Sequence, residues 1–147
     1  MTGDEHRDTL GMPDVLDEYP VPGPRSMDGV LGFSITELGE AEVFGEALVT
    51  DSVRQRFGLV HGGAYAALAE MIATEATVAK VHADGFDAMG TSNDTSFLKA
   101  ARGDAITASA RAIHRGRTTW VWEVSHTDGE DRLVAVSRVT IAVRSRD

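Results

Sequence analysis

The chain has 147 residues, no cysteine, and a formal net charge of −9 at pH 7. That length suits one domain with a real hydrophobic core. The lack of thiols excludes disulfides, thiolate nucleophiles and cysteine-bound zinc, and the acidic balance argues against a nucleic-acid partner, because phosphate binding relies on a basic surface.

The N-terminal segment differs in composition from the rest. Residues 1–25 are acidic and hold all four prolines, so we expect a loose tail and an extended lead-in there, followed by a single domain over residues 26–147. The N-terminus lacks the basic-then-apolar pattern of a signal peptide, and no apolar run reaches membrane-spanning length. We therefore expect a cytoplasmic protein without a membrane partner.

Two strands are predicted next. The pair Asp28-Gly29 indicates a turn. After it, apolar and polar residues alternate well enough to predict strands over residues 30–38 and 40–49, separated by Gly39.

A long helix is predicted after this pair of strands. About 20 residues rich in alanine, leucine and methionine follow Gly62, and Gly85 closes the helical region. Nearly every face of this helix is apolar, which indicates burial on several sides. Glu70 is the sharpest exception, and a carboxylate in that setting must be hydrogen-bonded, ion-paired or catalytic. The alternative to catalysis is a buried carboxylate that fixes dimer specificity.

The start of this helix has the features of an anion site. His61-Gly62-Gly63 leaves the first amide hydrogens without an intrahelical partner, at the positive end of the helix. An oxyanion hole requires that arrangement. Glu70 follows Gly62 by eight residues, roughly 12 Å along the axis, too far for both groups to reach one carbonyl. If they cooperate, they come from different subunits, so we predict a homodimer with two composite sites.

The last third of the chain predicts four more strands. They cover residues 86–99, 104–114, 117–127 and 132–144, with turns marked by Arg102-Gly103-Asp104, Arg115-Gly116 and Asp128-Gly129. Two strands, one buried helix and four neighbouring strands give an α+β fold, in which an antiparallel sheet wraps the helix. Trp120 and Trp122 fall on one strand face, where core or subunit packing is favoured over a ligand channel.

Charge is unevenly distributed along the chain. Residues 1–98 hold 5 basic and 17 acidic side chains, whereas residues 99–147 hold 9 and 6. A compact phosphorylated ligand can therefore dock on the last third. The alternative for any one arginine is a solvated strand face. The histidines lack the close spacing of a zinc motif, and we expect neither a metal nor a redox cofactor.

These residues carry a family resemblance over about residues 14–146. The string RQRFGLVHGGAYAALAEMIATEATVAKVH, continued by GTSNDTSF and HRGRTTWVWEVS, resembles the hotdog-fold acyl-CoA thioesterases, and most closely the glutamate-dependent 4-hydroxybenzoyl-CoA thioesterases. The resemblance implies a hotdog fold, with two sheets joined edge to edge in a dimer and two dimers in a homotetramer. It implies hydrolysis of 4-hydroxybenzoyl-CoA, as in aromatic degradation. The alternatives are phenylacetyl- or dihydroxynaphthoyl-CoA as substrate, and a non-catalytic acyl-CoA-binding protein.

The expected catalytic residues have separate roles. The amide of Gly62 polarises the thioester carbonyl, and Glu70 from the partner attacks the acyl carbon or activates water; the resemblance favours attack. Thr74 is placed to hold Glu70 or the water, and Gln55 can bind the water or the thioester oxygen. His61 is a further candidate, and its alternative role is to fix the turn by a backbone hydrogen bond.

Ligand-binding residues follow from the resemblance alone. Asp28 matches an acid that lies near the substrate hydroxyl in the family, and the alternative is an ordinary turn residue before Gly29. Glu75 matches a second acid of the family, and Gly63 completes the substrate-binding set. The expected coenzyme A contacts are Lys99, Arg117, Thr118 and Arg146; lysine and arginine at 99 and 117 depart from the arginine and serine of the family pattern.

Overall fold

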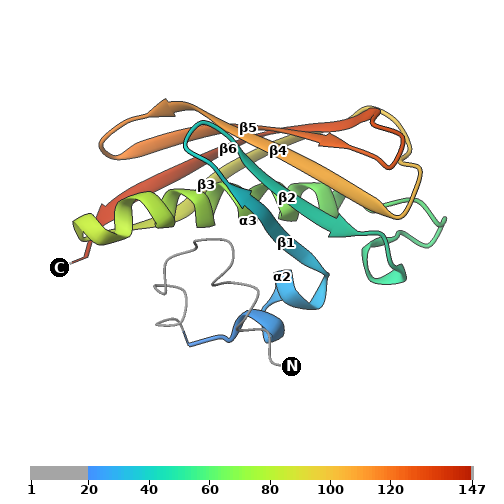
Figure 1. The fold of residues 1–147 in the computed structure, drawn as a ribbon, viewed down its shortest axis with the longest axis horizontal. Coiled ribbons are helices and arrows are strands. Elements are labelled where there is room, and N and C mark those ends of the chain that lie inside the picture. Colours follow the sequence, from blue (N-terminus) through green and yellow to red (C-terminus); the bar gives the residue numbers. More distant parts are fainter. Residues whose placement is uncertain (1–19, 147) are drawn as a thin grey trace.

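The structure, a computed structural model, describes residues 20–146. Within them, six strands form one antiparallel sheet, and a long helix lies across one face of it (Figure 1). The elements are β1 (Phe33–Leu38), β2 (Val43–Leu48), α3 (Gly62–Val81), β3 (Phe86–Phe97), β4 (Ala105–Arg115), β5 (Thr119–Thr127) and β6 (Leu133–Ser145). The predicted α+β architecture is confirmed, and every predicted strand is present with its ends shifted by a few residues.

The helix carries the chain from one side of the sheet to the other. The strand order is β1-β2-β4-β5-β6-β3, so β2 and β3, which flank α3 in the sequence, are separated by three strands in the sheet. The long connection through α3 crosses the sheet face and lets β3 pair with β6 at the far edge (Figure 1). Strands β1 and β3 are therefore the two edges among the described residues.

The core lies between the sheet and α3. Trp122 is fully buried, and its indole Nε1 donates a hydrogen bond of 2.9 Å to the Thr77 hydroxyl, which in turn donates to the carbonyl oxygen of Ala73. Trp120 is also buried, so packing, the favoured interpretation of both tryptophans, is confirmed. Gly45 permits close approach of helix and sheet, because a Cβ there would lie 2.5 Å from Cδ1 of Ile72.

A short helix replaces the turn predicted at Asp28. The helix α2 (Met27–Val30) makes one turn and is capped by Ser26, whose hydroxyl accepts a hydrogen bond of 3.2 Å from the amide of Gly29. A Cβ at Gly29 would lie 2.2 Å from the carbonyl oxygen of Gly23, so only glycine fits. The predicted tail over residues 1–25 lies mostly outside the described residues.

Within a single chain, α3 is buried around most of its circumference and leaves one stripe less covered. The sheet-facing side is buried, as the apolar pattern predicted. A stripe on another side is half-buried or exposed, and it consists of Gly63, Ala66, Ala67, Glu70 and Thr74. Glu70 is thus more exposed than its apolar neighbours in the sequence indicated. In the described part of the chain, no helix combines the length and the apolarity needed to cross a membrane.

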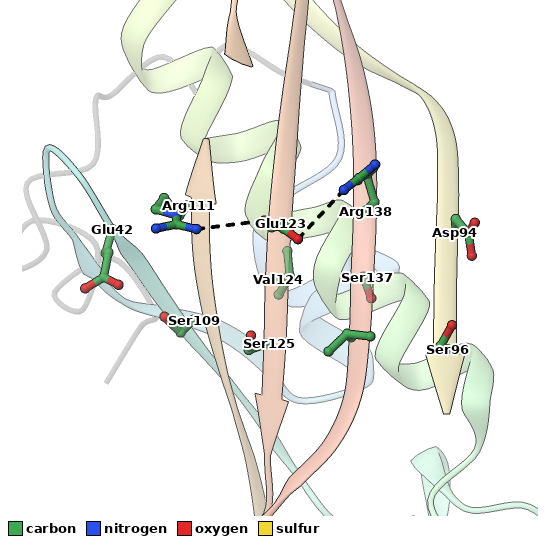
Figure 2. A pocket seen from close by; sticks show the side chains of 11 residues that line it. Glu42, Asp94, Ser96, Ser109, Arg111, Glu123, Val124, Ser125, Ser137 and Arg138 are labelled. Atoms are coloured by element: carbon green, nitrogen blue, oxygen red, sulfur yellow. Dashed lines mark ion pairs between the residues drawn. The ribbon is translucent and has the colours of Figure 1, made fainter. Parts of the chain in front are cut away.

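The opposite face of the sheet is polar. Glu123 on β5 lies between Arg111 on β4 and Arg138 on β6, at 3.8 Å from each guanidinium (Figure 2). These side chains border an open hollow of about 500 Å³. Both arginines keep more than 60% of their side-chain surface exposed (66% and 62%). The solvated-face interpretation is therefore correct for these two, which lie across the sheet from α3.

Candidate active site

At the N-terminus of α3, one backbone amide donates a hydrogen bond within the described residues and its neighbour does not. His61 is the N-cap residue, and its Nδ1 accepts a hydrogen bond of 2.8 Å from the amide of Gly63. Nδ1 is therefore unprotonated and the ring proton sits on Nε2. In the described residues, no protein group accepts a hydrogen bond from the amide of Gly62. That amide is a free donor at the positive end of the helix.

This free amide opens into a cavity of about 550 Å³, here called the glycine pocket. Its lining includes Gln55, His61, Gly62, Gly63, Tyr65, Phe97 and Lys99. Gln55 reaches the pocket because the chain folds back before the helix. The amide of Gln55 donates to the carbonyl oxygen of Leu59, and the amide of His61 donates to that of Val53, each at 2.8 Å.

Glu70 lies in a second cavity of about 630 Å³, here called the glutamate pocket. It is lined by Met27, Asp28, Ala66, Ala67, Glu70, Asn93, Thr95 and Phe97. The hydroxyl of Thr74 donates a hydrogen bond of 3.2 Å to Oε1 of Glu70. Phe97 is the one residue that lines both pockets. One chain therefore keeps Glu70 and the Gly62 amide in separate cavities.

Two glycines make space at these cavities. A Cβ at Gly90, on strand β3, would lie 2.7 Å from Oε1 of Glu70. A Cβ at Gly62 would lie 2.7 Å from Cζ of Phe97. Glycine at position 90 thus leaves room for the Glu70 carboxylate, and glycine at position 62 leaves room for the Phe97 ring beside the helix start.

Asp28 shares the glutamate pocket with Glu70. Burial and, secondarily, the negative charge of Glu70 raise the pKa of the half-buried Asp28 carboxyl above its usual value. A hydroxyl donor placed between the two acids would offset part of this cost. Glu75 is half-buried on α3 and lines neither pocket, because five residues carry it about 140° around the helix from Glu70.

The expected coenzyme A contacts are not brought together within one chain. Lys99 lines the glycine pocket. Arg117 and Thr118 lie at the opposite end of β4, whose 11 residues span more than about 30 Å. Arg146 lies beside the C-terminal end of α3, where its Nη2 donates a hydrogen bond of 2.8 Å to the carbonyl oxygen of His82.

Three pocket residues escaped the sequence interpretation. Asn93, Thr95 and Phe97 project from β3 toward the glutamate pocket. Their alternate positions in a predicted strand gave the signal that they share one face, but nothing in the sequence indicated which element that face meets. Among the described residues, no group of three or more His, Asp or Glu side chains could hold a metal ion.

Comparison with known proteins identifies the family. The model of the thioesterase superfamily matches residues 57–135, which is more than half of the chain. The chain belongs to the thioesterase superfamily. This thioesterase is 33% identical over 116 residues to the 1,4-dihydroxy-2-naphthoyl-CoA hydrolase of Listeria monocytogenes. The aligned residues cover 79% of this chain and 94% of that relative. The Mycobacterium tuberculosis protein Rv1847, which is named as an esterase, is 35% identical over 116 residues. These residues cover 78% of this chain and 83% of that relative.

Solved structures agree with the fold of the thioesterase. A Pseudomonas aeruginosa thioesterase superposes with a TM-score of 0.80 at 26% identity, covering 88% of this chain and 98% of that one. A Haemophilus influenzae thioesterase superposes with a TM-score of 0.77 at 28% identity, covering 87% of this chain and 94% of that one. The thioesterase has the hotdog fold, and the protein is an acyl-CoA thioester hydrolase.

Proposed function

We propose that the thioesterase hydrolyses an aromatic acyl-CoA thioester at composite sites built between two subunits. The observation that carries the proposal is the free amide of Gly62 in one pocket and the exposed carboxylate of Glu70 in another. They lie roughly 12 Å apart along α3. Two antiparallel copies of the helix would bring each amide to the partner's carboxylate.

The edge strand β3 supports such a dimer. It is 12 residues long, and in the described residues only β6 pairs with it. The other edge carries backbone groups ready for pairing with another chain. Its side chains are mostly exposed, and those of Met89 and Phe97 expose 52% and 60% of their surface. Antiparallel pairing of two β3 strands about a two-fold axis would join the sheets edge to edge, and two such dimers would form the proposed tetramer.

The proposed reaction uses groups with separate roles. The thioester oxygen accepts a hydrogen bond from the Gly62 amide, a donor whose loss typically costs ~2.7–4 kcal/mol. A carboxylate oxygen of Glu70 bonds to the acyl carbon as the C–S bond breaks and the thiolate of coenzyme A leaves. Water then cleaves the mixed anhydride, which releases the acid and restores Glu70. Gln55 orients the water or the thioester, and Thr74 holds the Glu70 carboxylate.

A related protein supports the pairing of Gln55 with Glu70. A Staphylococcus aureus thioesterase, 29% identical to this chain, has variant structures in which a glutamine or a glutamate is changed to alanine. Those two positions are fifteen residues apart in that protein, as Gln55 and Glu70 are here. The shared spacing supports the choice of Gln55 and Glu70 as a pair of site residues.

For the acyl group, we propose 4-hydroxybenzoyl. Its hydroxyl would donate a hydrogen bond to Asp28, whose carboxylate lies in the glutamate pocket. The second candidate is 1,4-dihydroxy-2-naphthoyl-CoA, which the name of the Listeria monocytogenes relative favours. Phenylacetyl-CoA offers Asp28 no hydroxyl and is the weaker alternative.

Free-thiol release from 4-hydroxybenzoyl-, 1,4-dihydroxy-2-naphthoyl-, benzoyl- and phenylacetyl-CoA tests the function. We expect wild type to favour a hydroxylated substrate, and the Glu70→Gln variant to lose about 10³-fold or more in kcat while keeping its fold, because the nucleophile is gone. Glu37→Gln, the same change at an exposed position of β1, is the matched control.

Unchanged hydrolysis by Glu70→Gln would assign Glu70 to dimer specificity. Inactivity of wild type on every aryl-CoA would refute the proposed function.

Substitution of Asp28 tests the choice of acyl group. Asp28→Ala removes the proposed acceptor of the ring hydroxyl, so the preference for 4-hydroxybenzoyl- over benzoyl-CoA should fall roughly tenfold or more. The ratio of the two kcat/KM values measures this preference. An unchanged ratio would mean that Asp28 does not contact the substrate hydroxyl.

A further inference from the structure

A row of polar side chains connects the core to the glutamate pocket. Nε2 of His126 lies 3.0 Å from Oγ of Ser137, which lies 2.8 Å from Oγ1 of Thr95. Oγ1 of Thr95 is 2.7 Å from Oδ1 of Asn93, and Nδ2 of Asn93 is 2.9 Å from the carbonyl oxygen of Ala66. The row, here called the His126 chain, thus crosses β5, β6 and β3 and ends on α3.

The hydrogen bonds of the His126 chain can run in only one direction. A carbonyl oxygen only accepts, so Asn93 must present its amide nitrogen to Ala66, which leaves Oδ1 to accept from the hydroxyl of Thr95. Because the hydroxyl hydrogen of Thr95 is used in the bond to Asn93, its oxygen accepts a hydrogen bond from the hydroxyl of Ser137. Ser137 then accepts from His126, which must carry its proton on Nε2.

The environment of His126 agrees with this direction. The ring is fully buried, it forms a T-shaped contact with Tyr65 at a centroid distance of 5.4 Å, and Nδ1 has no hydrogen-bond partner in the described residues. Burial lowers the pKa of His126 to about 4, because protonation of Nδ1 would place a charge and an unpaired donor in the core. The ring is therefore neutral at physiological pH and supplies one donor to the chain.

The other end of the His126 chain meets the turn of α3 that carries Glu70. Residues 66 and 70 both lie inside the helix, so the Ala66 carbonyl is also the acceptor of the Glu70 amide in the i to i+4 pattern. Asn93 thus binds the turn that carries Glu70 to the edge strand β3. Asn93 and Thr95 also line the glutamate pocket itself.

We propose that the His126 chain positions Glu70 for thioester hydrolysis, an inference that rests on the proposed function of Glu70. Asn93, Thr95, Ser137 and His126 are positioning residues, because they act through the helix turn and the pocket wall. The hydroxyl of Thr95 holds the Asn93 amide in the orientation that binds Ala66. Without that hydroxyl, the amide can rotate away and the turn loses its link to β3.

Three threonine substitutions test the proposal. Thr95→Val keeps the side-chain shape but removes the hydroxyl, and we expect kcat to fall about tenfold with KM within twofold, because the carboxylate is misplaced while binding surfaces remain. Thr95→Ser restores the hydroxyl and should stay within twofold of wild type. Thr107→Val, an exposed threonine on the opposite face of the sheet, should change neither constant. Equal kcat in the two valine variants would overturn the proposal, and so would an equal loss in Thr95→Ser, since packing would then be the cause.

Nuclear magnetic resonance provides a readout without substrate. The ¹⁵N signals of His126 should give the neutral Nε2–H tautomer from pH 8 to pH 5; the Nδ1–H tautomer would overturn the direction of the chain. Hydrogen exchange at the Glu70 amide should be several-fold faster in Thr95→Val and in Asn93→Ala than in Thr107→Val, and equal rates would overturn the link to the turn. If wild type hydrolyses no aryl-CoA, the proposed function fails while these two measurements still decide the role of the chain.

Discussion

Gly62 and Gly63 are adjacent, yet their amides have different partners. The Gly63 amide donates to Nδ1 of its neighbour His61, whereas the Gly62 amide has no acceptor in the described part of the chain. The helix start thus offers a ligand one donor rather than two. The histidine that makes the turn stable also selects which amide is available for the substrate.

Gly62→Pro and Gly62→Ala together isolate the contribution of this donor. Both add a Cβ that meets Phe97, but only proline removes the amide hydrogen. Proline is tolerated at the first helical position, and the preceding His61 already has the extended ψ of 133° that proline requires. We expect kcat/KM of the proline variant to fall below that of the alanine variant by about 10²–10³-fold. Equal values would mean that the Gly62 amide does not bind the carbonyl oxygen.

The residue contacts that the sequence could predict are those set by local spacing. Glu70 and Thr74 are one helical turn apart, so their hydrogen bond follows from helix geometry. The His126 chain could not be predicted in this way. Thr95 and Ser137 meet because β3 pairs with β6 in one particular register, and a sequence does not reveal the register of strands so far apart.

Most elements were predictable because each has a strong local signal. Alternation of apolar residues defined the strands, and the glycines at turns defined their ends. The exception is α2, which was predicted as a turn. One helical turn and an isolated turn share the same local residues, Asp28 and Gly29, and only the cap by Ser26 distinguishes them. The position of β3 at the sheet edge depends on the crossing of α3, a tertiary feature.

A buried acid, Asp128, joins the loop after β3 to the turn after β5. Asp128 follows β5, and its carboxylate accepts hydrogen bonds from the backbone amides of Arg102, Glu130 and Arg132. The guanidinium of Arg132 also donates to it, and to the carbonyl oxygen of Ala100 at 3.0 Å. These contacts fasten the loop after β3, which carries Lys99 into the glycine pocket. The hydrogen bonds hold the pKa of Asp128 well below its usual range.

Asp128→Asn should therefore lower the melting temperature by several degrees at pH 7. Because the folded state depresses the pKa of this acid, its stabilisation is complete above the unfolded value of about 4 and is lost as the pH falls below it. The difference in melting temperature between variant and wild type should thus narrow below about pH 4. Asp131→Asn is the matched control, since Asp131 is exposed and its positive φ of 59° suits asparagine. Equal effects of the two substitutions would contradict the role of Asp128.

The proposed composite sites would make activity depend on two chains. Each proposed site takes its carboxylate from one subunit and its amide from the other. A chain with a defective Glu70 and a chain with a defective Gly62 would each form inactive homodimers. In the mixed dimer, both defects fall in one site and the other site is intact.

Co-expression of a Glu70→Gln chain with a Gly62→Pro chain, purified with two different tags, tests this arrangement. Random pairing makes half of the dimers mixed and half of their sites intact, so the unsorted mixture should recover about a quarter of wild-type activity. Doubly tagged dimers should recover about half, and doubly tagged tetramers of two randomly associated dimers about 30%. No recovery in doubly tagged dimers would mean that each site lies within one chain.

Three elements, α2, α3 and β3, line the glutamate pocket, and α2 and β3 differ in how freely their residues can change. Thr95 belongs to the wall formed by β3, which is hydrogen-bonded to β6 and carries the proposed dimer edge, so larger side chains there risk the assembly. Met27 and Asp28 belong to α2, a single helical turn outside the sheet. Substitutions in α2 can reshape the cavity without altering strand pairing. Laboratory evolution toward new acyl groups should therefore find its first successful variants at positions 27 and 28.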